Sequence, residues 1–470
     1  MTSNCLIADE HTVVLLARLL AAAAGPGRTI LLDGPVGAGK THFARSFIRA
    51  RQGDQAEDVP SPTFTLVQTY DDPSGTEIWH ADLYRLTDPS ELDELGLEEA
   101  QDNAICLIEW PDRLDMLPPG AWTLAFETLD DPDLRRITMI GEGLDRLARC
   151  ARFLVEAGRI GDDIRPLAAD ASARRFFRLL SARGDAVLMD DPGGSSEAFC
   201  AISQWLTERG FKAPTMLHRD LPAGLLLVED LGDDLVARVL VEKPQLTPQI
   251  YDRITDFLIE LHRHEPPGFV PALDGAMLAQ QVGMFAQWYP QATDSDPDPA
   301  TQIGETVAAL HAKWAADLPP VLSLRDFHAE NLIWRGDAPL GLIDFQDAVA
   351  THPAYDLVSA LQDARRDVPR KIETSAIARY LDATGLDDDR FRAAYALLGA
   401  QRNLRIMGIF ARLCLRDGKS RYLQFMPRVW DNLWRDLSHP ALTSLAQLVK
   451  GLPAPDSDTI ERIRRKCARP

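Results

Sequence analysis

Residues 34–41 read Gly-Pro-Val-Gly-Ala-Gly-Lys-Thr, the Walker A pattern of a loop that binds nucleotide phosphates. The glycines let backbone N–H groups turn toward phosphate oxygens, and the N-terminus of a following helix adds positive potential. An apolar run of strand length at 28–33 precedes the loop, and a helical pattern at 41–51 follows it. Lys40 is expected to bridge the β- and γ-phosphates of ATP, and the Thr41 hydroxyl to ligate Mg²⁺. The predicted nucleotide-binding residues are Gly34, Pro35, Val36, Gly37, Ala38, Gly39, Lys40 and Thr41.

A second group of polar residues has the spacing found in kinase-type phosphotransferases. Asp326 and Asn331 are separated by four residues, and Asp344 follows thirteen residues after Asn331. Phosphoryl transfer needs a group that accepts the proton of the attacking hydroxyl, and oxygen ligands for Mg²⁺. Asp326 fits the base, while Asn331 and Asp344 fit the metal ligands. Two strands at 331–334 and 340–345 are expected to form a hairpin that brings these ligands together.

Two acids of the first region could complete the chemistry of the phosphate-binding loop. Glu109 ends an apolar strand predicted at 105–109, where an acid that orders a metal ion or a water molecule belongs. From the residues alone, Glu109 could equally be a surface acid at a strand end, and Asp82 a capping or ion-pairing acid. Trp110 is expected to pack rather than to stack on a nucleotide.

The helices and strands that must position these groups fall into two regions with different patterns of apolar residues. Up to residue 141, short apolar strands alternate with helical patterns, whereas from residue 248 onward the chain is mostly helical in period. The formal net charge is −20, of which residues 1–141 contribute −14. Such a step in charge fits two domains of different origin. We predict an α/β chain with a first domain at 1–141, a linker at 142–149 and a second domain at 150–470.

Composition excludes several classes of protein. With 46% hydrophobic and 26% charged residues, the chain is neither disordered, collagenous nor a coiled coil. The excess of acidic residues argues against a protein whose whole chain binds nucleic acid. No segment reaches the ~18 consecutive apolar residues of a membrane span. The six cysteines are scattered, which predicts neither a disulfide framework nor a zinc site, and a cytoplasmic location without membrane contact is expected.

The first region resembles the TsaE family, the small ATPases of bacterial tRNA threonylcarbamoyladenosine synthesis. The resemblance covers about residues 1–141 and is carried by the phosphate-binding loop and by motifs at 61–67, 80–86, 94–99 and 107–111. It implies a P-loop ATPase domain that works with the TsaB and TsaD proteins, and thereby reaches tRNA indirectly, to modify adenosine 37. It also implies that Thr63 lies in a switch-like loop, and that Asp82 and Glu109 are the acids near the metal ion and the attacking water.

The second region resembles the aminoglycoside phosphotransferases and, within them, the AmgK family of anomeric sugar kinases in cell-wall recycling. The resemblance covers roughly residues 150–450, with motifs at 170–178, 187–190, 226–232, 402–410 and 422–430. It implies a protein-kinase-like fold of two lobes and ATP-dependent 1-phosphorylation of N-acetylmuramate and N-acetylglucosamine. It also implies that the backbone from Glu229 to Leu231 is a hinge that hydrogen-bonds adenine.

This second resemblance has two departures. Leu324 stands where the kinase pattern has histidine, and residues 186–189 lack the expected lysine. We expect an arginine of the 174–178 segment to neutralise the negative charge of the phosphates instead, and we take Arg175 as the candidate. The helix around Arg402 could face the sugar or a lactyl carboxylate, or could be an ordinary amphipathic helix. The region could also act on an aminoglycoside or another small alcohol, or be a non-catalytic module that regulates the ATPase.

Overall fold

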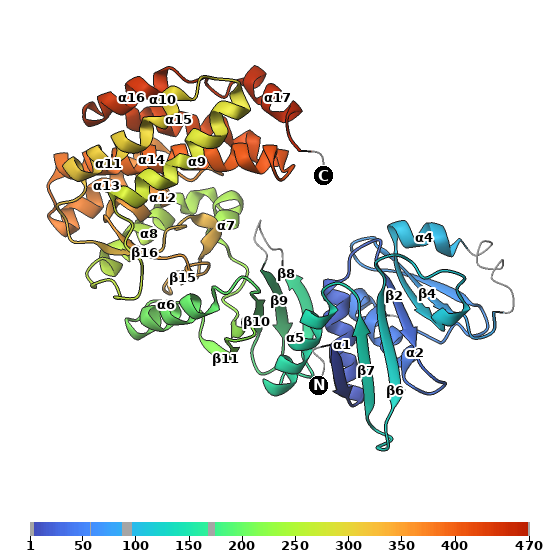
Figure 1. The fold of residues 1–470 in the computed structure, drawn as a ribbon. Helices are drawn as coiled ribbons and strands as arrows, with labels where there is room; N and C mark the ends of the chain where they lie inside the picture. The colour runs from blue at the N-terminus through green and yellow to red at the C-terminus, as the bar shows by residue number, and fades with distance from the viewer. Residues whose placement is uncertain (1–3, 57, 87–95, 168–173, 469–470) are drawn as a thin grey trace. The chain divides into compact units, whose positions relative to one another are not determined.

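The computed structural model describes residues 4–56, 58–86, 96–167 and 174–468, and it is a mixed α/β structure as predicted (Figure 1). The chain divides into two compact units. Unit 1 comprises Met1–Glu197 and Thr215–Asp230, and unit 2 comprises Ala198–Pro214 and Leu231–Pro470. Residues 94–95 of one predicted motif and 170–173 of another lie outside the described residues.

The first part of unit 1 is a seven-stranded sheet with the order β1-β7-β6-β2-β5-β4-β3. Four parallel strands form its centre: β2 (Thr29–Asp33), β4 (Glu77–Asp82), β5 (Ile105–Glu109) and β6 (Trp122–Thr128). Antiparallel strands flank them: β1 (Cys5–Ala8), β3 (Val67–Asp71) and β7 (Arg135–Ile140). Apolar residues of α1 (Glu10–Ala23) and α2 (Lys40–Gln52) pack on one face, and those of α4 (Leu97–Asn103) on the other. The carboxyl ends of the parallel strands therefore share one edge of a three-layer structure.

The second part of unit 1 is an antiparallel sheet with the order β11-β12-β10-β9-β8. Its strands are β8 (Asp163–Leu167), β9 (Arg175–Leu180), β10 (Ala186–Asp190), β11 (Met216–Asp220) and β12 (Leu225–Glu229). Helix α5 (Leu144–Glu156) precedes this sheet and occupies most of the predicted linker at 142–149. Seven residues of α5 are buried, so this stretch of the chain is a packed helix.

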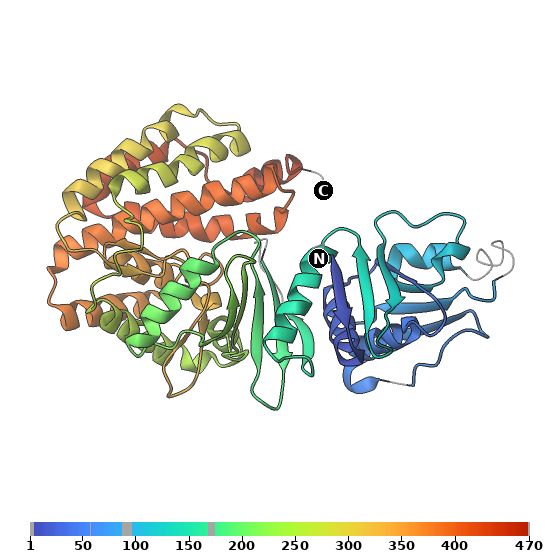
Figure 2. The same ribbon diagram turned by 60° about the horizontal axis from the view of Figure 1, so that its bottom comes forward.

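A single apolar core joins the two sheets of unit 1. Helix α1 packs against α2, against α5 and against β8, and buried side chains from all of them belong to one cluster that extends to β12. Polar contacts reinforce this junction, since the Arg18 guanidinium donates to the carbonyl oxygens of Gly161 (2.9 Å) and Asp162 (3.0 Å). Arg152 of α5 donates to the carbonyl oxygen of Cys5 at 2.8 Å. Figure 2 shows α5 between β8 and the N-terminal strands.

Unit 2 is mostly helical, as its sequence period predicts. Its longest helix, α14 (Asp388–Leu415), packs against α9 (Gly275–Thr293), α11 (Ile303–Trp314), α12 (Ala354–Leu361) and α15 (Met426–Leu437). A Cβ at Gly408 would lie 2.5 Å from the backbone nitrogen of Phe285, so only glycine allows α14 to approach α9 this closely.

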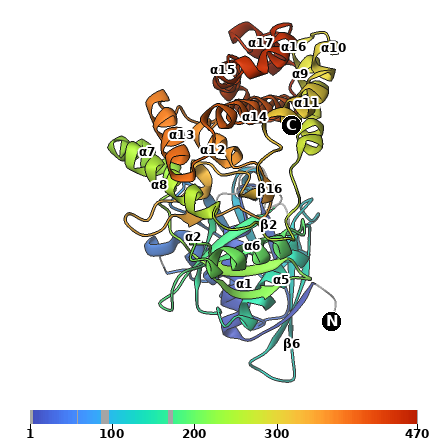
Figure 3. The same ribbon diagram turned by 90° about the vertical axis from the view of Figure 1, so that its left-hand side faces the viewer.

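Seven further helices complete unit 2 (Figure 3). They are α6 (Ser196–Glu208), α7 (Val236–Glu242), α8 (Thr247–Leu261), α10 (Asp298–Thr301), α13 (Arg370–Thr384), α16 (Thr443–Lys450) and α17 (Ser457–Arg465). In the parts of the chain that the structure describes, no helix combines the length and the apolar character needed to cross a membrane.

Two small antiparallel sheets lie in the middle of unit 2. Strand β13 (Val321–Ser323) pairs with β16 (Val349–Thr351), and β14 (Leu332–Ile333) pairs with β15 (Gly341–Leu342). The second pair is the predicted hairpin, with strands shorter than expected. Together the two sheets hold both ends of the segment that contains Asp326 and Asn331.

Cys414 at the end of α14 forms a disulfide with Cys467, which lies after α17. The sequence analysis did not predict this bridge, because nothing in the spacing of two cysteines 53 residues apart shows that the chain folds back there. The other four cysteines are free thiols: Cys5, Cys106, Cys150 and Cys200.

We expect Leu147→Ala to destabilise both sheets of unit 1 together. Leu147 is fully buried on α5 within the shared core, and truncating a buried leucine typically costs about 2–5 kcal/mol. Native-state hydrogen exchange should show faster exchange of amides in α1 as well as in β9 and β10. The matched control is Leu117→Ala at an exposed leucine, which should change neither group. Acceleration confined to β9 and β10 would contradict a common core.

Candidate active sites

The phosphate-binding loop at 34–41 connects β2 to α2, as the sequence predicts. Gly34, Gly37 and Gly39 have φ values of 143°, 78° and 105°, a region of backbone conformation that favours glycine. A Cβ at Gly34 would lie 2.5 Å from the carbonyl oxygen of Phe126, so no side chain fits there. The glycines are thus required by the shape of the loop as well as by its chemistry.

Lys40 is the first residue of α2, and its side chain is buried beneath the loop. Its ammonium group donates to the carbonyl oxygens of Gly34 (2.7 Å) and Pro35 (3.0 Å), and lies 3.7 Å from the ring centroid of Trp110. Burial lowers the pKa of Lys40, while the nearby carboxylates of Glu109 and Asp82 favour its charged form. The cation is therefore held inside the loop where phosphate oxygens would bind.

Glu109 and Asp82 end the neighbouring parallel strands β5 and β4, where they are register partners. One carboxylate oxygen of Glu109 accepts a hydrogen bond from the Thr41 hydroxyl at 3.1 Å, and the other lies 3.0 Å from Nε2 of His80. Both Glu109 and His80 are buried. Glu109 is thus oriented from two sides, toward the start of α2.

Asp82 connects the sheet to the predicted switch-like loop. Its carboxylate accepts hydrogen bonds from the hydroxyls of Thr63 (2.5 Å) and Ser61 (3.1 Å), and its other oxygen accepts from the backbone N–H of Tyr84 (3.1 Å). The structure therefore brings all five predicted chemical groups of the first region to one edge of the sheet: Lys40, Thr41, Thr63, Asp82 and Glu109.

Sequence reasoning missed two residues of this site. His80 was part of a motif but was given no role, and its ring fixes the Glu109 carboxylate. Trp110 was expected only to pack, yet its ring lies against the Lys40 ammonium group and pairs with Tyr84 at 5.0 Å between centroids. The φ of Trp110 is 62°, in the left-handed region that residues other than glycine rarely adopt. Nothing in the sequence around Trp110 predicts this left-handed conformation after the end of a strand.

In unit 2, Asn331 joins the other two predicted groups of the second site. Its Nδ2 donates to the backbone oxygen of Asp326 at 2.9 Å and to a carboxylate oxygen of Asp344 at 3.5 Å. The second carboxylate oxygen of Asp344 accepts from the amide of Gln346 at 3.1 Å. Asp344 itself has a φ of 59°. Asn331 and Asp344 therefore meet across the β14–β15 hairpin, as predicted.

The segment before Asp326 is held by the buried carboxylate of Asp356 on α12. That carboxylate accepts hydrogen bonds from the Ser323 hydroxyl (2.6 Å) and from the backbone N–H groups of Leu324 (2.6 Å) and Arg325 (3.1 Å). Burial raises the pKa of Asp356 to about 6 in spite of these bonds. Arg325 has a φ of 68°, so Asp356 holds a strained backbone next to the predicted base.

Asp326 is held ionised by the cations around it. Burial alone would raise the pKa of its carboxyl group, but the charges of Arg402, Arg405 and Arg325 outweigh this effect and lower it. Within the described residues, no side chain or backbone group hydrogen-bonds to the Asp326 carboxylate. An ionised carboxylate with free lone pairs can accept the proton of a hydroxyl group.

The three remaining residues predicted to bind nucleotide, Arg175, Glu229 and Leu231, have varied surroundings. The Arg175 guanidinium donates to the buried Asp190 carboxylate at 2.9 and 2.6 Å, and Arg146 pairs with the same carboxylate. The Glu229 carboxylate accepts from the Thr215 hydroxyl at 2.7 Å. Leu231 is the first residue of the long segment of unit 2. Roles for all three in nucleotide binding stay predictions.

The donor sets of both sites fit Mg²⁺ bound together with nucleotide phosphates. Mg²⁺ usually binds proteins through one or two side chains and completes its octahedron with phosphate oxygens and water. Thr41 with Glu109, and Asn331 with Asp344, each offer two neutral or anionic oxygen ligands of that kind. The described part of the chain has no cluster of three or more His, Cys, Asp or Glu side chains able to hold a metal ion.

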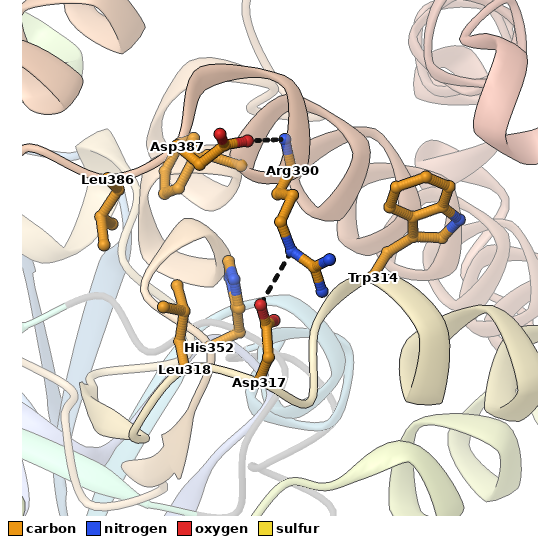
Figure 4. Close-up of a pocket in the computed structure, with 8 residues that line it drawn as sticks. Trp314, Asp317, Leu318, His352, Leu386, Asp387 and Arg390 are labelled. Carbon is orange, nitrogen blue, oxygen red and sulfur yellow. Dashed lines mark hydrogen bonds and ion pairs between the residues drawn. The ribbon is translucent and has the colours of Figure 1, made fainter.

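A small hollow elsewhere in unit 2 is unrelated to these groups (Figure 4). Its volume is about 40 Å³, which is room for a water molecule but not for a sugar. Arg390 and Asp317 form an ion pair across it at 2.8 Å. Its lining contains none of the predicted site residues and consists of Trp314, Asp317, Leu318, His352, Leu386, Asp387, Arg390 and Phe391.

Comparisons with known families divide the chain between the two sheets of unit 1. Residues 7–137 match the family described as threonylcarbamoyl adenosine biosynthesis protein TsaE, and residues 163–395 match the phosphotransferase enzyme family. An N-acetylmuramate/N-acetylglucosamine kinase of Caulobacter vibrioides is 38% identical over 64% of this chain and 95% of its own length. The enzyme of the same name from Pseudomonas aeruginosa is 32% identical over 61% of this chain and 88% of its own.

The first region has relatives of its own. A tRNA threonylcarbamoyladenosine biosynthesis protein TsaE of Rickettsia bellii is 39% identical over 28% of this chain and 90% of its own length. Each set of relatives is thus covered almost completely by a different part of the chain. The chain therefore belongs to two families, to TsaE through residues 7–137 and to the phosphotransferase enzymes through residues 163–395.

Proposed function

We propose that the chain is a bifunctional enzyme: an ATPase that supports threonylcarbamoyladenosine modification of tRNA, joined to an ATP-dependent kinase for N-acetylmuramate and N-acetylglucosamine. The observation that carries this proposal is that each family region brings together its own set of phosphoryl-transfer groups. A non-catalytic second region is not favoured, because Asp326, Asn331 and Asp344 are all present and adjacent. An aminoglycoside acceptor is not favoured by the relatives, which are named as amino-sugar kinases.

In the first site, the loop N–H groups and Lys40 would bind the phosphates of ATP. Thr41 and Glu109 would hold Mg²⁺, which when bound neutralises phosphate charge. Asp82 is coupled to Thr63 by a 2.5 Å hydrogen bond, so a change in the switch-like loop would reach the acid next to the attacking water. Glu109 is fixed by His80 and orients that water.

In the second site, Asp326 would accept the proton of the anomeric hydroxyl as that oxygen attacks the γ-phosphate. The free carboxylate oxygens of Asp326 and its lowered pKa support this role. Asn331 and Asp344 would hold Mg²⁺ on the phosphates. Backbone groups from Glu229 to Leu231 would bind adenine, and Arg175 would add positive charge near the phosphates.

The partners of the first region would be TsaB and TsaD, with tRNA reached through them. The support is the family membership together with the charge of residues 1–141, whose net value of −14 repels tRNA phosphates. ATP, tRNA and soluble amino sugars meet in the cytoplasm, which is the compartment we propose.

We expect Lys40→Ala to abolish ATP-dependent threonylcarbamoylation while leaving sugar phosphorylation intact. The variant removes the cation inside the phosphate-binding loop, and that loop supplies no group to the Asp326 site. The measurement is modified nucleoside by mass spectrometry, with TsaB, TsaD and tRNA present, beside sugar phosphate formation by the same preparation. The control is Lys450→Ala, an exposed lysine, which should retain both activities. Equal loss of both in a folded Lys40→Ala protein would contradict separate sites.

Asp326→Asn should lower kcat for sugar phosphorylation roughly 10²–10⁴-fold with little change in ATP binding, because a general base is removed. Asp344→Ala should weaken Mg·ATP binding as well, since it removes a metal ligand. Steady-state kinetics and ATP titrations distinguish the two variants. Asp337→Asn, at an exposed aspartate near the hairpin, is the control. If Asp326→Asn matches the wild type on N-acetylmuramate while Asp344→Ala is inactive, Asp326 is not the base.

The full chain without TsaB and TsaD should bind tRNA weakly at physiological salt. Tight binding of nucleic acid requires cationic side chains that release counterions, and the first region has 24 acidic but only 10 basic residues. A salt titration of fluorescently labelled tRNA measures this, with a TsaB–TsaD–tRNA mixture as the positive control. Tight binding by the chain alone that falls steeply with salt would contradict the indirect role.

A further inference from the structure

We propose that Arg366 is a positioning residue of the second site, which holds Glu330 and thereby sets where the neighbouring Asn331 can bind Mg²⁺. This inference rests on the proposed kinase function and adds a residue that controls its metal ion. Arg366 lies 36 residues after Glu330 in the sequence, so the local spacing of the predicted site residues does not point to it.

The guanidinium group of Arg366 joins three separate parts of unit 2. Its Nη2 donates to the Glu330 carboxylate at 2.7 Å, and its Nε donates to the Asp363 carboxylate at 2.7 Å. Its Nη1 donates to the backbone oxygen of Ala237 in α7 at 3.2 Å. Each nitrogen atom thus has a different acceptor, an arrangement that the planar fork of a guanidinium allows and that a lysine ammonium does not reproduce.

Arg366 is anchored on the side of Asp363. The side chain of Asp363 is 1% exposed and that of Arg366 is 15% exposed. A buried carboxylate that loses its cation is strongly destabilised, so this pair holds Arg366 in place. The Glu330 side chain is 37% exposed, and an ion pair at such a position typically contributes less than about 1 kcal/mol to stability. The contact with Glu330 therefore matters mainly for where Glu330 is held, and little for the stability of the fold.

Glu330 and Asn331 share a single helical turn, Ala329–Asn331. A turn of three residues has too few hydrogen bonds of its own to be stable, so contacts with the rest of unit 2 must fix its place. The backbone N–H of Ile343 donates to the Asn331 carbonyl oxygen at 3.1 Å, and Arg366 binds the residue before Asn331. The direction of the Asn331 side chain thus depends on how Glu330 is held.

The same stretch of chain holds the other end of the catalytic segment. Asp356 on α12 binds the backbone just before the predicted base Asp326. Arg366 follows α12 in the chain and binds the residue just before the metal ligand Asn331. Residues 354–366 therefore place the base and the metal ligand through two different contacts. Loss of the Arg366 contact should disturb the metal ion while leaving the base in place.

Arg366 could instead bind a phosphate of ATP directly. Its Nε, Nη1 and Nη2 atoms all have acceptors within the protein, however, and most of its side chain is covered. A phosphate would have to displace the Glu330 carboxylate from the guanidinium group, which would leave two anions side by side. Because like charges repel, the positioning role is the one we propose.

The test measures the initial rate of N-acetylmuramate phosphorylation by the full chain as a function of free Mg²⁺, at saturating ATP and sugar. Arg366→Gln should raise the Mg²⁺ concentration for half-maximal rate roughly 10–100-fold, the range typical for residues that orient a metal ligand. Excess Mg²⁺ should restore most of kcat. The KM for the sugar should stay within about twofold of the wild type, because no contact with the sugar is removed. A merely structural role would lower the melting temperature without moving the Mg²⁺ dependence.

Further variants separate the Glu330 contact from the rest. Glu330→Gln leaves the pair of Arg366 with Asp363 in place and should raise the Mg²⁺ requirement roughly tenfold. The double variant should be no worse than Arg366→Gln alone, because both substitutions act through one contact. Arg366→Lys keeps the charge but cannot reach all three acceptors, so its shift should be intermediate. The matched control is Arg379→Gln, at an exposed arginine that pairs with Asp256 at 2.6 Å and should keep the wild-type Mg²⁺ dependence.

A second readout does not depend on turnover. Binding of Mn²⁺ together with a non-hydrolysable ATP analogue can be followed by electron paramagnetic resonance in a Lys40→Ala background, which removes nucleotide from the first site. The affinity for Mn²⁺ should fall in Arg366→Gln and in Glu330→Gln, and it should stay unchanged in Arg379→Gln.

Unchanged metal dependence in both glutamine variants would overturn the proposal. A raised KM for ATP at saturating Mg²⁺, with no change in the Mg²⁺ requirement, would overturn it in favour of direct phosphate binding. If Arg366→Gln fails to fold, Glu330→Gln decides the outcome. If the wild type phosphorylates no sugar, the kinase proposal itself has failed, and Mn²⁺ binding must still weaken in Glu330→Gln for the role of Arg366 to stand.

Discussion

The burial of α1 from two directions is the constraint on which unit 1 depends. One side of this helix packs on α2, which begins with Lys40, and another side packs on α5 and β8. The apolar surface of α1 would otherwise be exposed to water, and the antiparallel sheet would lose part of the core that covers one of its faces. A five-stranded sheet needs such a cover to be stable. The P-loop region and the small sheet that follows it are therefore joined by packing as well as by covalent connection.

Both candidate sites place a strained residue next to a reactive acid. Trp110 follows Glu109 in a left-handed conformation, Arg325 precedes Asp326 in another, and Asp344 adopts one itself. Such conformations cost of order 1–3 kcal/mol each and persist only when the surroundings enforce them. Asp356 supplies that enforcement at the second site through three hydrogen bonds to the loop. In both folds, a residue in the left-handed backbone conformation thus helps to orient a carboxylate.

Local patterns in the sequence were sufficient for much of this arrangement. Strand β5 begins and ends where its apolar run predicts, and the loop at 34–41 lies between a strand and a helix as expected. Strand β1 was missed because it has four residues and exists through pairing with the distant β7. The spacing of Asp326, Asn331 and Asp344 predicted their proximity, since the hairpin between them is local.

Packing between residues far apart in the chain determines features of the fold that local sequence patterns do not predict. Which residues of α14 meet each neighbouring element depends on how the helix is rotated, and close contacts such as Gly408 against α9 limit that rotation. A helical period shows that a face exists but not which neighbour it meets. Likewise, the glycines at 141 and 143 favoured a linker at 142–149, yet the start of α5 is buried by α1, which lies more than a hundred residues earlier.

The central claim is that one chain holds two separate ATP sites, and nucleotide-binding stoichiometry tests it most directly. Equilibrium dialysis of the full chain with a non-hydrolysable ATP analogue and Mg²⁺ should give two molecules bound per chain at saturation. Lys40→Ala should remove one of them and Asp344→Ala the other. A single bound nucleotide in the wild type, or loss of both through either substitution, would contradict the account.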